Sequence, residues 1–257
     1  MSVDDLHLES MHNFRDIAGP GYETPDGPMR RGYFFRANIV APSDADAEAL
    51  ARVGLRTIVD LRRPEEVEKN PDHDVIGADY VHVDVLGESS SAATIVGYDE
   101  EATPETARSE MLRVYRSFVI DAAFRERLRP AFEAVIASAG PVVVHCTVGK
   151  DRTGFMSAVL QLLAGVGRED ILADYLETNR RSEAWVADLA AMFREHAPER
   201  ADTLIELLHA RDEYIIASLD AIAAEYGSAR EYLIEGVGIS ADDVDRLRDT
   251  LLGHESD

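Results

Sequence analysis

Several features are scarce or missing in this chain of 257 residues, and each scarcity excludes a class of protein. The chain has one cysteine, so it cannot form an internal disulfide. No run approaches the ~20 apolar residues of a membrane-spanning helix. The first residues lack the basic and apolar regions of a secretory signal peptide. We therefore expect a cytoplasmic protein with no stable membrane insertion, although export without a cleaved signal peptide remains an alternative.

Positive charge is scarce as well. Lys and Arg number 26 against 49 Asp and Glu, which gives a formal net charge of -23. Such a charge argues against nucleic acid as a partner and against nonspecific docking on anionic bilayers. The eight histidines are scattered, with no H-x3-H pair and no cysteine partner, so we expect no metal and no cofactor. A site for an anionic substrate must then be a local island of positive charge.

Strand patterns alternate with helix patterns up to about residue 168, and only helix patterns follow. This order predicts one α/β domain over residues 1–257, with a central, largely parallel sheet flanked by helices in 1–168 and a helical region in 169–257. The predicted strands are Tyr33–Arg36, Thr57–Leu61, Tyr80–Val85 and Val142–His145. The predicted helices are Ser43–Arg52, Glu105–Ile120, Phe124–Ala137, Thr153–Ala164, Asp170–Asn179, Glu183–Arg194, Ala201–Tyr226 and Ala241–Leu252.

One predicted helix of the C-terminal region carries an apolar stripe. Trp185, Met192 and Phe193 recur at roughly i, i+7 and i+8, a spacing that favours ordinary core packing. A helical lid over the functional site is the alternative.

The single cysteine lies where a predicted strand meets a predicted helix, in the run HCTVGKDRTG at residues 145–154. Backbone N–H groups of such a loop can point at an anion, and the helix adds the positive end of its dipole. Gly149 lets the backbone close around the ligand, and Arg152 offers a planar fork for two phosphate oxygens. The positive end of a helix dipole and a nearby cationic group lower a thiol pKa from roughly 8.5 to about 3.5–7.5. The run therefore predicts a phosphate site with Cys146 as nucleophile.

The pattern H-C-x-x-G-K-D-R-T-G resembles the signature of a family of bacterial cysteine-dependent tyrosine phosphatases. This resemblance implies a cysteine-phosphatase fold and the hydrolysis of phosphotyrosine and, in several members, of phosphoserine, phosphothreonine or phosphoinositides. The expected partner is thus a phosphorylated protein or a phosphoinositide, and the oligomeric state is left open. Further matching segments are NFRD at residues 13–16, GYFFRA at 32–37, VDLR at 59–62, ADYL at 173–176, EYGS at 225–228 and GIS at 238–240.

Attack of a Cys146 thiolate on a phosphate ester would give a phosphocysteine, while Arg152 and the loop amides hold the oxygens. Thr153 can donate a hydrogen bond to the sulfur, and His145 organises the loop through hydrogen bonds. The ammonium of Lys150 favours substrates with a second negative group, so phosphotyrosine and phosphoinositides are comparable candidates. The residues expected to bind substrate are Thr147, Val148, Gly149, Lys150 and Thr153.

A general acid must protonate the leaving oxygen. In the family that the chain resembles, this acid is expected in a Pro-Asp step after the strand matched by Tyr80–Val85, and here that step is missing. The candidates are Asp84, Glu88 and Asp151, and we favour Asp151 because it lies within the loop.

Two further carboxylates, those of Asp16 and Asp60, lie beside arginines in matching segments. We expect them to tie loops together or to orient Arg152 by hydrogen bonds.

Two alternatives to a phosphatase reuse the same loop. The first is arsenate reduction or sulfur transfer, of which reduction normally needs resolving cysteines that this chain lacks. The second is a catalytically silent module that binds phosphorylated partners, against which the intact Cys146 and Arg152 argue.

Overall fold

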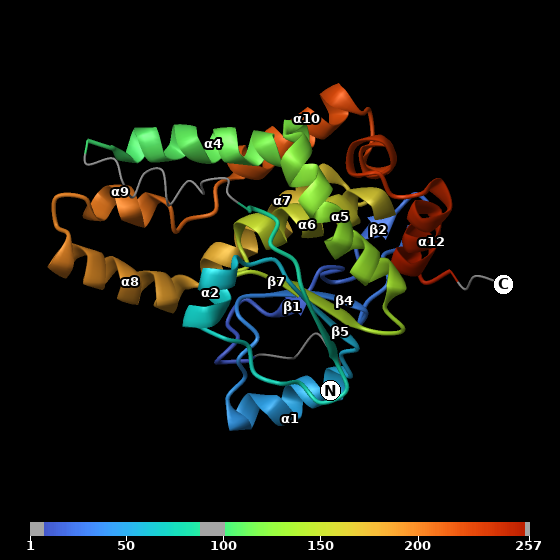
Figure 1. Cartoon of the computed structure of the whole chain (residues 1–257), viewed down its shortest axis with the longest axis horizontal. Coiled ribbons are helices and arrows are strands. Elements are labelled where there is room, and N and C mark those ends of the chain that lie inside the picture. The colour runs from blue at the N-terminus through green and yellow to red at the C-terminus, as the bar shows by residue number, and fades with distance from the viewer. Residues whose placement is uncertain (1–7, 88–100, 255–257) are drawn as a thin grey trace.

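The computed structural model describes residues 8–87 and 101–254, and Figure 1 shows how their helices and strands are arranged. The strands are β1 (Arg15–Asp16), β2 (Glu23–Thr24), β3 (Gly27–Pro28), β4 (Phe34–Ala37), β5 (Thr57–Asp60), β6 (Asp79–His82) and β7 (Val142–His145). β2 and β3 form a separate hairpin, and the other five strands form one sheet in the order β1-β4-β7-β5-β6. β1 is antiparallel to β4, whereas the remaining neighbours are parallel.

Helices flank this sheet on both faces, with α1 on one side and α5 and α6 among those on the other (Figure 1). None of the helices in the described ranges is long and apolar enough to cross a bilayer. The bounds are α1 (Asp44–Val53), α2 (Pro64–Lys69), α4 (Pro104–Ile120), α5 (Ala122–Ala137), α6 (Asp151–Ala164), α7 (Arg168–Arg181), α8 (Glu183–His196), α9 (Ala201–Glu206), α10 (Asp212–Glu225), α11 (Ala229–Glu231), the π-helix η2 (Tyr232–Val237) and α12 (Ala241–Leu252).

Alternating strand residues build two cores, one on each face of the sheet. Ile58 and Val143 pack with Leu50 of α1, whereas the next residues, Val59 and Val144, belong to the larger core on the other face. A strand that is buried on both faces has a continuous run of apolar residues, and such runs made these strands predictable from the sequence. The predicted fold class, a largely parallel sheet flanked by helices with a helical C-terminal region, is confirmed.

The helix predicted over Ala201–Tyr226 is interrupted between α9 and α10. At this break the side chain of Asn179 on α7 both accepts from the backbone N–H of Ala210 (2.8 Å) and donates to its carbonyl (2.7 Å). The ammonium of Lys150 donates to the carbonyl of Leu207. Tertiary hydrogen bonds thus replace helical ones, and they place this connection beside the loop that follows β7.

The apolar stripe on α8 does not enter the core, so that prediction is wrong. Only Ala190 of this helix is buried, and Met192 is 44% exposed. The half-buried ring of Trp185 stacks on His12 instead. α8 runs beside α9 at one end of the molecule (Figure 1). The alternative of a helical lid stays a prediction.

Candidate active site

The carboxyl ends of three parallel strands meet where the cysteine loop begins. Ala37 of β4 and Asp60 of β5 both pair with His145, the last residue of β7. Cys146 follows directly, and α6 begins at Asp151. Ligands of parallel α/β sheets bind outside the carboxyl ends of the strands, so the topology alone brings the loop to a place where a ligand can bind.

The loop itself has the properties of an anion site. Within the described ranges, the backbone N–H groups of residues 147–150 donate to no acceptor, and no side chain caps the start of α6. Unpaired amides at a helix N-terminus bind anions. Gly149 has φ +74°, and a Cβ there would lie 2.2 Å from the carbonyl oxygen of Ala37. Only glycine fits this turn, which buries Cys146 to 3% exposure.

Buried side chains hold the loop by its carbonyl oxygens. Asn13 Nδ2 donates to the carbonyls of Val148 (3.0 Å) and Gly149 (3.1 Å), and Arg36 Nη2 donates to that of Gly149 (2.8 Å). With its carbonyls bound in this way, the loop leaves its N–H groups for a ligand. The matching segment NFRD therefore contributes Asn13 to the site, a role that the sequence analysis missed.

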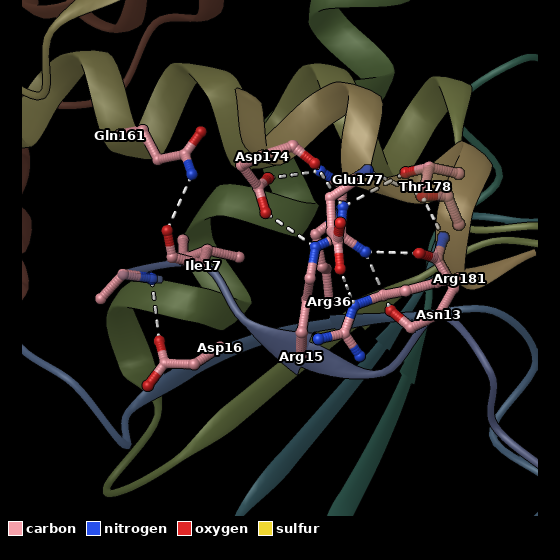
Figure 2. Close-up of polar contacts among 12 residues, drawn as sticks. Asn13, Arg15, Asp16, Ile17, Arg36, Gln161, Asp174, Glu177, Thr178 and Arg181 are labelled. Carbon is pink, nitrogen blue, oxygen red and sulfur yellow. Dashed lines mark hydrogen bonds and ion pairs between the residues drawn. The ribbon is translucent and has the colours of Figure 1, made fainter. Parts of the chain in front are cut away.

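Figure 2 shows that Asp174 lies between two arginines from neighbouring strands. Arg15 and Arg36 face each other in the antiparallel β1–β4 pair, where two like charges alone would be destabilising. Asp174 lies 2.7 Å from Nε of Arg15 and 2.7 Å from Nη1 of Arg36. Burial acts to raise the pKa of Asp174, but the attraction of both guanidinium groups outweighs it and holds the pKa below its usual value.

Glu66 is the residue that orients Arg152, and the sequence analysis did not identify it. Its carboxylate forms a bidentate pair with Arg152, at 2.7 Å to Nη1 and 2.8 Å to Nη2. It also accepts from the Thr147 hydroxyl and from the backbone N–H of Arg63 at the start of α2. Burial opposes ionisation, but these bonds lower the pKa of Glu66 to about 2. A proline at N1 followed by a glutamate at N3 was the available sign of a helix start here.

Asp151, the favoured general acid, lies at the edge of the active-site pocket. The Tyr115 hydroxyl donates to its Oδ1 at 2.8 Å, and the Lys150 ammonium is 3.5 Å from the same oxygen. Burial is the main cause that raises the pKa of Tyr115 well above its usual value, and the negative charge of Asp151 is the second. The phenol therefore stays a hydrogen-bond donor to Asp151, whose side chain borders the pocket beside Arg152.

The Lys150 ammonium, which we expected to meet a second negative group of the substrate, is bound within the protein. Its side chain is 2% exposed, and its ammonium donates to the carbonyls of Leu207 and His209 beyond α9. In this geometry Lys150 ties the cysteine loop to the helical region.

Asp60 and His145 form a buried polar cluster beneath the loop. Asp60 accepts from Nε and Nη2 of Arg62, and the Tyr80 hydroxyl donates to it at 2.6 Å. His145 Nε2 lies 2.8 Å from Asp72. Asp60, Asp72 and His145 are close enough to share a metal ion, but the Arg62 guanidinium already pairs with both carboxylates. The cluster serves to fix the loop, and Asp60 makes no bond to Arg152.

The remaining predicted residues are Asp16, Asp84, Glu88 and Thr153. Asp16 accepts from the N–H groups of Ala18 and Gly32 and ties a turn, and its burial raises its pKa to about 6. Asp84 accepts from the amides of the next turn. Glu88 lies outside the described residues. Thr153 is fully buried, and its hydroxyl has no hydrogen-bond partner in the part of the chain that the structure describes.

The pocket above the loop has a volume of about 460 Å³ and a mixed lining. Its polar and charged lining residues are Arg63, Glu65, Glu66, Thr147, Asp151 and Arg152. Its apolar lining includes Leu86, Met111, Val114, Phe118, Leu207 and Leu208. The apolar part comes largely from α4 and from the connection after α9.

Several known proteins are similar to this chain over most of its length. The chain is 33% identical to a tyrosine-protein phosphatase of Cupriavidus necator, over 95% of this chain and 87% of that protein. It is 29% identical to the triple specificity protein phosphatase PtpB of Mycobacterium tuberculosis, over 96% and 98% of the two chains. The crystal structure of TpbA from P. aeruginosa matches with 16% identity and a TM-score of 0.30, over 78% of this chain and 98% of that one.

A family-level comparison covers almost the whole chain. The model of the tyrosine phosphatase family matches residues 6–253. This match spans the sheet, the cysteine loop and the helical C-terminal region, and the predicted resemblance is thereby confirmed. The chain belongs to the tyrosine phosphatase family and is a phosphatase, a hydrolase of phosphate esters.

Proposed function

We propose that this phosphatase acts on aryl phosphate monoesters, phosphotyrosine above all, through a phosphocysteine intermediate on Cys146. The observation that carries this proposal is the mixed lining of the active-site pocket. An amide-lined loop and Arg152 suit a phosphate dianion, while the apolar residues that line the same pocket suit a flat aromatic ring.

The reaction proceeds in two steps. In the first, the Cys146 thiolate attacks phosphorus, an S–P bond forms, and the ester O–P bond breaks while Asp151 transfers its proton to the leaving oxygen. In the second, Asp151 takes a proton from water, whose oxygen attacks phosphorus, and the S–P bond breaks to regenerate the thiolate. Arg152 and the loop amides bind the three equatorial oxygens in both steps.

Other phosphate esters are secondary substrates in this proposal. The printed name of the M. tuberculosis relative, triple specificity protein phosphatase, supports a range wider than phosphotyrosine. Lys150 is engaged with Leu207 and does not reach toward a second phosphate, so the geometry favours phosphotyrosine over phosphoinositides.

The nucleophile is tested with Cys146→Ser and a small aryl phosphate. We expect wild type to hydrolyse it with inhibition by vanadate, and Cys146→Ser to bind phosphotyrosine without turnover. Phosphoenzyme trapped on Cys146 in an acid quench would support the intermediate. Equal turnover by both proteins would contradict the proposal.

The acid is tested by leaving-group dependence. Loss of a general acid lowers the rate about 10²–10⁴-fold for a substrate with a poor leaving group and much less for one with a good leaving group. We expect Asp151→Asn to lose activity on an alkyl phosphate far more than on a nitrophenyl phosphate, with Asp84→Asn as the matched control. If Asp84→Asn shows the larger selective loss, Asp151 is not the acid.

A further inference from the structure

A second pocket lies beside the active-site pocket and shares Thr147 with it. Its volume is about 580 Å³, and its walls come from the end of α2, the segments flanking β1 and β4, and the start of α8. Thr147 is the residue after the nucleophile, and its hydroxyl is bonded to Glu66. A substrate whose phosphate lies on the loop therefore has a neighbouring cavity within reach of its flanking groups.

The charge of this second pocket differs from that of the molecule as a whole. The chain has 49 acidic residues, yet none of the described residues that line the pocket is acidic. Its lining includes Lys69, one of the two lysines, together with His12 and His73. None of the ion pairs formed among the described residues involves Lys69, which lies in the last turn of α2. Lys69 has its ammonium available for a ligand.

Two further features suit the pocket to a ligand. His12 Nε2 is buried and has no hydrogen-bond partner within the described ranges. The ring of His12 stacks on Trp185, the single tryptophan, with centroids 5.9 Å apart and an interplanar angle of 21°. Stacked rings near a lysine give the pocket an aromatic part next to one positive charge.

We propose that this pocket is a substrate subsite for a second anionic group, the carboxylate or phosphate of a residue flanking phosphotyrosine in a phosphoprotein. The inference rests on the proposed function and adds a sequence preference to it. Phosphoproteins fit better than phosphoinositides because a net charge of -23 repels an anionic bilayer. The acidic surface disfavours an acidic peptide in general, so a flanking acidic residue fits best at a pocket whose described lining has no carboxylate.

The experiment compares two phosphotyrosine peptides of equal length, one with glutamates flanking phosphotyrosine and one with glutamines. We expect wild type to favour the acidic peptide in kcat/KM, and Lys69→Ala to reduce this preference by about three- to fivefold, the size of one exposed charge pair. Lys69→Glu should favour the glutamine peptide, a reversal that misfolding does not produce. Arg246→Ala on α12 removes one exposed positive charge away from this pocket and should keep the wild-type preference.

The outcomes separate the subsite from the activity. Turnover of an aryl phosphate with no Lys69-dependent peptide preference overturns the subsite and leaves the proposed function intact. No aryl phosphate turnover by wild type overturns the proposed function itself. If Lys69→Ala changes only the ratio of inositol bisphosphate to monophosphate hydrolysis, the second anion belongs to a phosphoinositide, and the phosphoprotein assignment is wrong.

Discussion

Arg152 illustrates how a single side chain depends on a partner that lies 86 residues earlier in the chain. Glu66 holds both of its terminal nitrogens, and the Leu61 carbonyl accepts a further bond at 3.2 Å. A guanidinium fixed in one plane is preorganised for two phosphate oxygens. Because we expect Glu66 to act through Arg152, it is a positioning residue.

Glu66→Gln should therefore impair catalysis without removing the nucleophile. The amide keeps the shape of the side chain but replaces one acceptor oxygen with a donor, so Arg152 loses its bidentate partner. We expect kcat/KM for an aryl phosphate to fall by about 10²-fold, as for a misplaced catalytic group, with a weaker affinity for vanadate.

The matched control is Glu68→Gln, which makes the same change at an exposed position of the same helix. It should leave both kcat/KM and vanadate affinity unchanged. If the two variants behave alike, the pair between Glu66 and Arg152 has no role in catalysis.

At the scale of elements, Asp174 joins β1, β4 and α7 beneath the cysteine loop. The carboxylate pairs with Arg15 and Arg36, and Arg36 in turn holds the Gly149 carbonyl. Removing one member of a buried charge cluster leaves the others uncompensated, at a cost of about 3–5 kcal/mol. We expect Asp174→Asn to lower the free energy of unfolding by that amount in urea titrations.

The control for this cluster is Asp220→Asn on α10. Asp220 is 60% exposed and pairs with Arg168 at 2.7 Å, so its loss should cost at most about 1 kcal/mol. Equal losses in the two variants would contradict a special role for the buried cluster.

Asp174 also predicts a pH dependence. Its folded pKa lies below the value in the unfolded chain, so its stabilisation is complete above about pH 4 and is lost as pH falls through the folded pKa. The difference in unfolding free energy between wild type and Asp174→Asn should shrink below pH 4. If the difference in unfolding free energy grows on acidification, the pKa of Asp174 is not lowered by folding.

At the scale of the whole molecule, a net charge of -23 surrounds the site that we propose for a phosphate dianion. At about 0.01 M salt the screening length is about 30 Å, and at 0.15 M it is about 8 Å. Long-range repulsion should therefore slow substrate capture at low salt. We expect kcat/KM for an aryl phosphate to rise between these two concentrations while kcat stays nearly constant. If kcat/KM falls over this range, attraction of the substrate by the local positive site outweighs repulsion by the net charge.

The sequence was sufficient wherever the information is local. A strand, a cysteine loop and a helix start are encoded within the eleven positions from Val142 to Arg152. They could be predicted because each depends on neighbouring backbone and side chains. The parallel sheet and its flanking helices follow from the alternation of periodicities, which was confirmed. The loop's position at the carboxyl end of β7 follows from that same order.

Tertiary structure alone decided which distant groups meet at this loop. Glu66 pairs with Arg152, and Asn13 donates a hydrogen bond to the Val148 carbonyl. Lys150 donates to the Leu207 carbonyl, where the predicted helix is interrupted. No local pattern encodes these contacts, because buried donors and acceptors are satisfied by whichever segments the packing brings together. The second pocket, whose described lining has no carboxylate, also forms only once the ends of α2 and α8 and the segments around β1 and β4 meet in the folded chain.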